Sequence, residues 1–162
     1  MRLFQSFGPA DWINFGLLIV ASLALVAAAV GAFAAYRQFQ ASVRATRATL
    51  LKDLYLQFRN DELIAEAFYK IEYGVFRYTS EFHKSDDERK IDLLLTLCDL
   101  VCAMYDDRTL TDKEMKYFRY LFKRIHCNSE IKKYLAFLDD FYKKNNMHKK
   151  AFEQFQIYGS KL

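Results

Sequence analysis

The sequence contains few glycines, and this scarcity limits the chemistry that the chain can support. Only five of its 162 residues are glycine, and beyond residue 36 they are Gly74 and Gly159 alone. Phosphate-binding loops and dinucleotide fingerprints need several glycines within a few residues, because the backbone must approach the phosphates closely. Two isolated glycines exclude nucleotide-driven catalysis through these loops. We predict no catalytic residue and no cofactor.

Cysteine is also scarce, and its spacing does not suggest a disulfide framework or a metal site. The chain has three cysteines, of which Cys98 and Cys102 are four residues apart and so share one helical face. If the following helix folds back as a hairpin, His126 lies roughly 9 Å along the axis from Cys98, too far to share an ion. We therefore expect both cysteines to act as small core residues, with zinc binding as the minor alternative.

Charge is absent from residues 12–36, which are bounded by Asp11 and Arg37. A helix over this run rises about 37 Å, against about 30 Å for the hydrocarbon core of a bilayer. The run therefore predicts one transmembrane helix with some tilt. A cleaved signal peptide is the alternative, but its apolar core would be shorter, and basic residues behind it oppose export.

Basic residues are distributed unequally around this run, and the inequality predicts an orientation. Only Arg2 precedes it, whereas Arg37, Arg44 and Arg47 follow closely. Because the side richer in Lys and Arg faces the cytoplasm, we predict a single-pass protein of the inner (plasma) membrane. Its N-terminus would lie outside and its C-terminal domain in the cytoplasm. The membrane-proximal basic residues would contact lipid headgroups.

Small residues recur at every fourth position in the second half of the predicted span. Ala27, Gly31 and Ala35 form one such row. Small faces let two helix backbones approach closely, and packing then drives association in lipid. We predict transmembrane helix packing through these three residues and a homo-oligomer. The alternative is that alanine serves only as an apolar filler.

The rest of the chain predicts helices and no strand. Because no Gly or Pro lies between Gly31 and Gly74, the helix leaving the membrane should continue to about residue 58. Apolar residues at helical spacing then predict five further helices, over about 61–75, 86–105, 112–125, 129–141 and 147–158. The fold class is all-α. Residues 1–36 form the tail and transmembrane helix, 37–60 a juxtamembrane helix, and 61–162 a cytoplasmic helical bundle.

Polar residues at the helix starts predict how these helices are capped. Asn60 can cap the helix that follows it, and Asn128 or Ser129 the helix from about residue 129. Ser85 with Glu88, and Thr111 with Glu114, fit the capping-box pattern.

The predicted helix 86–105 is apolar nearly all round, which places it at the centre of the bundle. Its polar stripe includes Asp92 and Asp99, which we expect to form salt bridges with a neighbouring Lys or Arg. A catalytic pair is disfavoured, because no nucleophile or convergent histidine accompanies them. His83 and His148 show no partner pattern.

Nucleic-acid binding is also disfavoured. The segment 113–124 has a basic outer face after a helix and a short turn, which is loosely typical of a helix-turn-helix. The preceding helix is long, however, and the turn lacks glycine. The densest basic cluster, Lys143, Lys144, Lys149 and Lys150, is more typical of a solvated face.

Two segments carry a resemblance to a known group of proteins. YRQFQASVRATRATLL directly follows the apolar run, and YDDRTLTDKEMKYF lies later in the chain. Together with the N-terminal span they resemble an uncharacterised family of bacterial single-span inner-membrane proteins with a helical cytoplasmic domain of unknown function. The resemblance implies an inner-membrane location, and it supplies no activity and no catalytic residue.

These observations favour a membrane-anchored, non-enzymatic interaction or regulatory module with an unidentified cytoplasmic protein partner. The alternative is a membrane-active effector, for example in phage defence, that disrupts the inner membrane when it oligomerises. Apart from the aromatic ends, only Asn14 and Ser22 are polar within the apolar run. A span with so few polar residues is unsuited to lining a water-filled pore. This favours the interaction module over the membrane-active effector.

Overall fold

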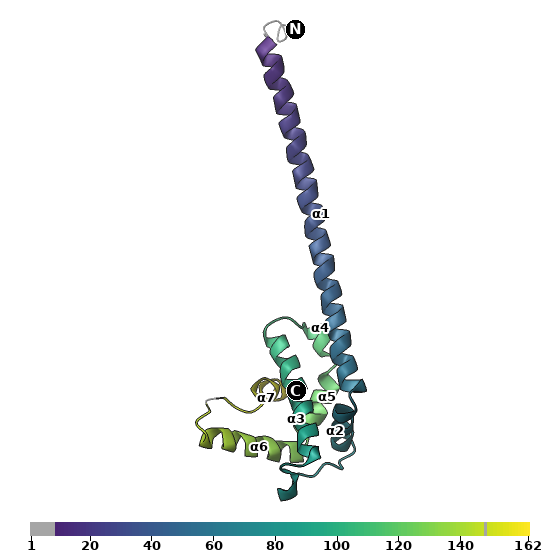
Figure 1. Ribbon diagram of the computed structural model, residues 1–162, viewed down its shortest axis with the longest axis vertical. Coiled ribbons are helices and arrows are strands. Elements are labelled where there is room, and N and C mark those ends of the chain that lie inside the picture. The colour runs from purple at the N-terminus through teal and green to yellow at the C-terminus, as the bar shows by residue number, and fades with distance from the viewer. Residues whose placement is uncertain (1–8, 148) are drawn as a thin grey trace. The chain divides into compact units, whose positions relative to one another are not determined.

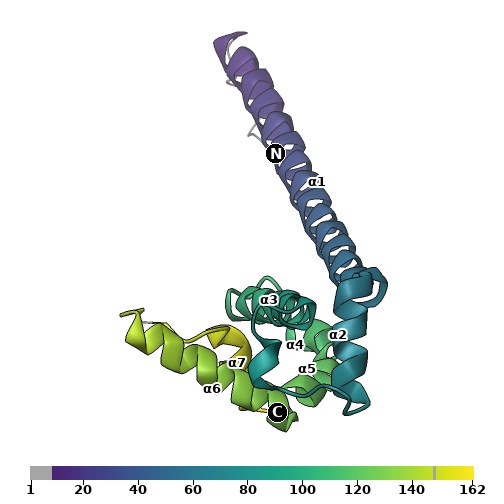
Figure 2. The ribbon, with the colours of Figure 1, turned by 60° about the horizontal axis from the view of Figure 1, so that its bottom comes forward.

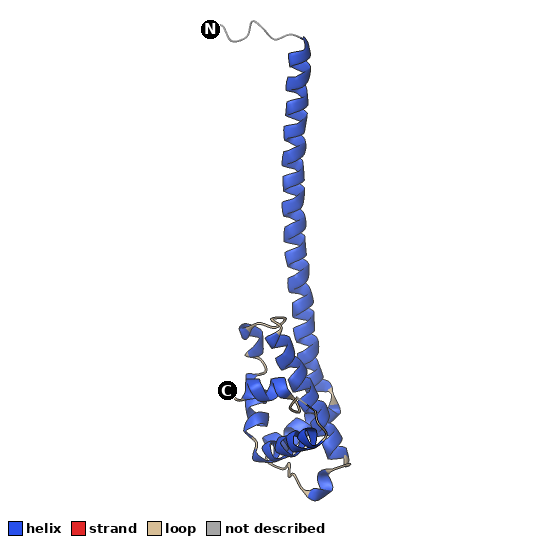
Figure 3. Cartoon of the chain, turned by 90° about the vertical axis from the view of Figure 1, so that its left-hand side faces the viewer, coloured by secondary structure: helices blue, strands red, loops and turns tan. Residues whose placement is uncertain are grey.

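The protein is described by a computed structural model that covers residues 9–147 and 149–162. Within these residues all regular structure is helical and no strand is present (Figure 3), so the predicted all-α class is confirmed. The elements, labelled in Figure 1, are α1 (Pro9–Asn60), α2 (Glu62–Glu72), η1 (Ser80–Phe82), α3 (Asp86–Asp106), α4 (Asp112–Met115), α5 (Arg119–Cys127), α6 (Ser129–Lys144) and α7 (Glu153–Gly159).

Helix α1 runs without interruption through the apolar segment and beyond it, and the part beyond Gly31 is continuous as the absence of Gly and Pro there predicts. The chain divides into two compact units, Met1–Thr46 and Arg47–Leu162. The second unit contains the whole hydrophobic core, to which the end of α1 contributes the buried side chains of Leu54 and Phe58. The last turns of α1 are therefore part of the bundle.

The start of α2 differs from the sequence prediction by one residue. Asn60 is the last residue of α1, and Asp61 caps α2 in its place. One carboxylate oxygen of Asp61 accepts hydrogen bonds from the amides of Leu63 and Ile64, at 3.0 and 3.1 Å. Asp61 is extended, as a capping residue must be, whereas Asn60 is still helical.

Helix α3 is the centre of the bundle, as predicted. It packs against α2 on one side and α7 on another (Figure 2). Its buried side chains are Ile91, Leu94, Leu95, Leu97, Cys98, Val101 and Cys102.

The capping box predicted at the start of α3 is only half formed. The amide of Glu88 donates to Ser85 Oγ at 3.2 Å, but the Glu88 carboxylate accepts from the Lys84 amide instead of the Ser85 amide.

The helix predicted over 112–125 is two helices, α4 and α5, separated by a tight turn. In this turn the amides of Tyr117 and Phe118 donate to the carbonyls three residues earlier, both at 3.1 Å. The turn allows both Met115 and Phe118 to be buried, at 2% exposure each. The predicted contact at the start of α4 is present, because the Glu114 carboxylate accepts from the Thr111 amide at 2.6 Å.

Helix α7 is shorter than predicted and is fixed by two carboxylates from other helices. Asp99 of α3 accepts from the Phe155 amide at 2.9 Å, and Asp139 of α6 accepts from the Ala151 amide at 3.1 Å. The prediction that Asp99 forms a salt bridge is therefore wrong. Its carboxylate satisfies an amide in the first turn of α7, where the helix dipole favours an anion.

Candidate functional site

The residues predicted to pack transmembrane helices lie on the exposed surface of α1. Ala27, Gly31 and Ala35 are all exposed, and a Cβ atom added at Gly31 would meet no atom of the described chain within 4 Å. A larger side chain at Gly31 therefore fits the single chain without strain. Any effect of such a change on association would have to come from a contact between molecules.

The basic residues that follow the apolar run differ in their surroundings. Arg37 lies over the ring of Phe33, with its guanidinium carbon 5.9 Å from the ring centroid. Arg44 is exposed and Arg47 is half-buried. Hydrogen bonds from Thr111 hold the pKa of Glu114 below its usual value, and the charge of Arg47 adds to this effect. Arg2 lies outside the described residues.

A chain of polar side chains joins the loop before α3 to α3 and α6. His83 lies between Tyr78 and Glu88, with Nε2 2.9 Å from the Tyr78 hydroxyl and Nδ1 2.9 Å from Glu88 Oε1. The buried hydroxyl of Tyr134 on α6 donates to Asp92 at 2.7 Å and approaches Glu88 at 3.4 Å. Asp92 therefore has a tyrosine partner in place of the predicted salt bridge.

The two carboxylates of this cluster respond differently to their surroundings. Burial raises the pKa of Asp92, and the Tyr134 hydrogen bond only partly opposes this effect. Burial alone would raise the pKa of Glu88 as well, but the Lys84 amide and the His83 ring hold it below its usual value. Because every polar member has a partner, the cluster is suited to holding the loop against α3 and α6.

The sequence did not reveal this cluster. Tyr78, His83 and Glu88 are spaced by five residues and straddle a loop and a helix start, so no helical or strand period connects them. Tyr134 is more than forty positions away from both of its partners. His148, the other histidine singled out in the sequence, lies outside the described residues.

Two of the three cysteines, Cys98 and Cys102, are placed as the sequence predicts. Cys98 and Cys102 are buried in the core, and Cys127 is exposed. Burial raises the pKa of Cys102 to about 12, and it raises that of Cys98 as well, so both are protonated thiols at neutral pH. Among the described residues, no group of three or more His, Cys, Asp or Glu side chains is placed to hold a metal ion.

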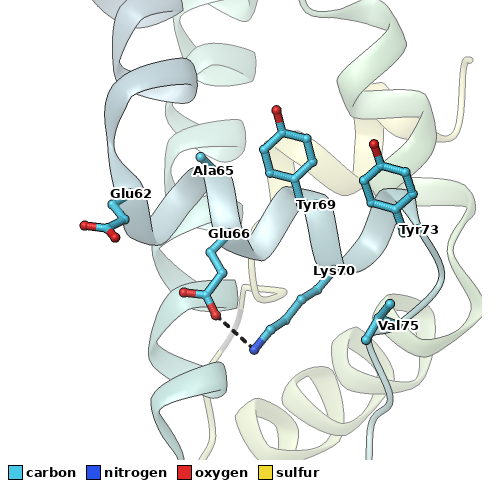
Figure 4. A pocket seen from close by; sticks show the side chains of 7 residues that line it. All are labelled: Glu62, Ala65, Glu66, Tyr69, Lys70, Tyr73 and Val75. Carbon is cyan, nitrogen blue, oxygen red and sulfur yellow. Dashed lines mark ion pairs between the residues drawn. The ribbon is translucent and has the colours of Figure 1, made fainter.

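A hollow on the outward side of α2 is the candidate binding site of the bundle (Figure 4). Its lining residues are Glu62, Ala65, Glu66, Tyr69, Lys70, Tyr73 and Val75. Glu66 forms ion pairs with Lys70, which also lines the hollow, at 3.1 Å and with Lys90 of α3 at 2.8 Å. Lys90 and then Lys70 hold the pKa of Glu66 below its usual value. The hollow combines aromatic rings with a neutralised ion network, which suits contact with a protein surface.

Comparison with protein families, with curated proteins and with solved structures gave no match, so no family is identified for the chain.

Proposed function

We propose that this chain is a single-pass protein of the inner membrane whose cytoplasmic helical domain acts as a non-enzymatic interaction or regulatory module. The observation that carries the proposal is the exposed apolar surface of α1. None of the most apolar part of this helix is buried by the rest of the described chain. Leu25 is 73% exposed and Phe33 is 62% exposed. So large an apolar surface requires an apolar environment, which a bilayer provides.

This exposure favours a membrane span over the central helix of a soluble bundle. A core helix of similar composition would be covered by its neighbours, as α3 is. The bundle has its own core, in which the earlier part of α1 takes no part. The apolar segment of α1 lies outside that core, and a role in anchoring would account for its composition.

The polar content of the span favours the module over the membrane-active effector. Ser22, one of its two polar residues, donates its hydroxyl to the Leu18 carbonyl of the same helix at 2.7 Å. Apart from the aromatic ends, Asn14 is the only other polar side chain of the run. A span with so few polar side chains is unsuited to lining an aqueous path. Inducing the protein in cells and following the membrane potential tests this choice. An unchanged potential is expected, and a collapse on induction would favour the effector.

A topology reporter tests the proposed orientation. The excess of Arg after residue 36 should retain the bundle in the cytoplasm. A reporter enzyme that is active only in the periplasm, fused after Leu162, should therefore give no signal. A cytoplasmic reporter at the same position should be active and serves as the control. Strong periplasmic activity from an uncleaved membrane protein would reverse the orientation.

Replacing Gly31 with leucine tests association through the row of small residues. Gly31→Leu keeps the span apolar and meets open space within one chain, so insertion should be retained. Self-association should weaken, because a bulky side chain prevents the close approach of two backbones. The measurement is a two-hybrid signal between membrane spans. Val30→Leu, one position around the helix, is the matched control, and equal signals for both variants and the wild type would contradict the predicted packing.

A further inference from the structure

A second hollow of the bundle lies among α3, α4, α5 and α7. Its volume is about 310 Å³, near the lower end of the range for small-molecule pockets, about 300 to 1,000 Å³. Its lining residues are Tyr105, Asp112, Met115, Lys116, Arg119, Tyr158, Lys161 and Leu162. These side chains come from segments that are distant in the sequence, so the tertiary fold creates the hollow.

Two tyrosine rings form an aromatic wall of this hollow. Tyr105 of α3 and Tyr158 of α7 meet edge to face, with ring centroids 5.5 Å apart and planes inclined by 79°. Tyr158 also packs against Phe122 of the core, and the Tyr105 hydroxyl donates to Asp112 at 2.5 Å. Both rings are therefore held in place without a ligand, which suits them to contact the organic part of a small molecule.

Three cationic side chains line the same hollow and have no acidic partner in the described part of the chain. Lys116, Arg119 and Lys161 are exposed, and none of them forms an ion pair with a described carboxylate, the terminal one included. Burial raises the pKa of Tyr158, and the nearby charge of Arg119 opposes this rise. Asp112, the acidic side chain of the lining, already accepts a tyrosine hydroxyl. The lining side chains therefore carry an excess of positive charge, which an anion would complement.

A phosphate monoester matches this combination of charge and aromatic surface. Its phosphate carries about −1.5 to −2 charges at neutral pH, whereas a carboxylate would bring a single charge to three cations. Arginine and lysine are also the side chains that bind phosphate groups in proteins.

We propose that this hollow binds a small phosphate monoester, with the phosphate among Lys116, Arg119 and Lys161 and the organic group against the two tyrosine rings. The hollow lies entirely within the unit 47–162, so this binding goes beyond the proposed membrane anchoring and does not depend on the packing of the spans. Soluble phosphate esters and the headgroup of phosphatidic acid both present this chemical group, and the choice of probe distinguishes them.

Isothermal titration calorimetry of the full chain in phosphatidylcholine nanodiscs tests the binding. Phenyl phosphate represents a soluble aromatic ester, and glycerol 3-phosphate represents the headgroup of phosphatidic acid. We expect saturable binding of at least one probe with a Kd below about 1 mM. Tighter binding of phenyl phosphate would assign the hollow to soluble esters, and tighter binding of glycerol 3-phosphate would assign it to the lipid headgroup. The absence of saturable binding for both probes would overturn the proposal.

Single charge changes test whether the hollow is the place of binding. Arg119→Gln and Lys161→Gln should each weaken binding of the tighter probe about threefold to tenfold, because each removes a cation that would face the phosphate. Asp112→Asn should act in the opposite direction and tighten binding about threefold, because it removes a negative charge from the hollow. Its amide oxygen can still accept the Tyr105 hydroxyl.

Arg59→Gln is the matched control for these changes. Arg59 is exposed, and it lies outside the lining of the hollow, so its loss should leave the Kd unchanged. Equal circular dichroism melts for the variants and the wild type show that they are folded. If folded Arg119→Gln and Lys161→Gln both bind the probe as tightly as Arg59→Gln does, the phosphate binds elsewhere and the proposal is overturned.

Discussion

Replacing Leu94 with alanine is expected to lower the free energy of unfolding of the bundle by about 2 to 5 kcal/mol. Leu94 is fully buried, and it lies on α3, the helix that packs against both α2 and α7. Truncation removes apolar contacts and leaves a cavity that the surrounding side chains cannot fill without moving. Denaturant unfolding of residues 47–162, followed by circular dichroism, measures the change.

The adjacent residue provides a control for this prediction. Leu93 is 39% exposed, so Leu93→Ala removes the same number of atoms from a site that water already reaches. Its effect should remain within about 0.5 kcal/mol, as is usual for surface positions. Similar losses for the two variants would mean that α3 is not packed as described, since the helix propensities of the two substitutions are the same.

Replacing Tyr134 with phenylalanine is expected to cost about 1 to 3 kcal/mol, the usual range when a buried group loses its hydrogen-bond partner. The variant keeps the ring and deletes only the hydroxyl that donates to Asp92 at 2.7 Å. The Asp92 carboxylate would then remain partly buried without its donor. Thermal and denaturant unfolding of the same fragment measure this loss.

Asp92→Asn should have the opposite sign at neutral pH and should stabilise the bundle or leave it unchanged. Burial raises the pKa of Asp92, so the folded state binds its proton more tightly than the unfolded state does. Stability therefore falls as the pH rises from the ordinary pKa of aspartate through the raised pKa of folded Asp92. At pH values below the ordinary range for aspartate the group is protonated in both states, and this loss of stability disappears. The stability difference between Asp92→Asn and the wild type should accordingly shrink on acidification.

Combining the two substitutions isolates the interaction. In the Asp92→Asn background the acceptor is an uncharged amide, so Tyr134→Phe should cost less than it does in the wild type, because hydrogen bonds to charged groups are the stronger ones. The double-mutant cycle therefore predicts a coupling of about 0.5 kcal/mol or more. Simple additivity of the two changes would contradict a stronger hydrogen bond from Tyr134 to the Asp92 carboxylate than to an amide.

The sequence alone was sufficient for those features that depend on neighbouring residues. An unbroken α1 follows from the absence of Gly and Pro between Gly31 and Gly74, which leaves no local break in the helix. The central position of α3 follows from apolar residues around most of that helix, which give it a buried surface broad enough to pack against both α2 and α7. The hydrogen bond between the Thr111 amide and the Glu114 carboxylate joins residues only three positions apart, so the sequence pattern predicts it.

Only the tertiary structure decided the features that join distant segments. Asp99 and Asp92 were expected to meet cations, but one accepts from an amide of α7 and the other from the hydroxyl of Tyr134. The division between α4 and α5 allows both Met115 and Phe118 to be buried. Local helix propensity does not predict this division. The sequence also did not reveal the exposed side of α2, because the spacing of its tyrosines does not show whether they are buried or exposed. In each case the deciding interaction lies between residues that the fold, and not the chain order, brings together.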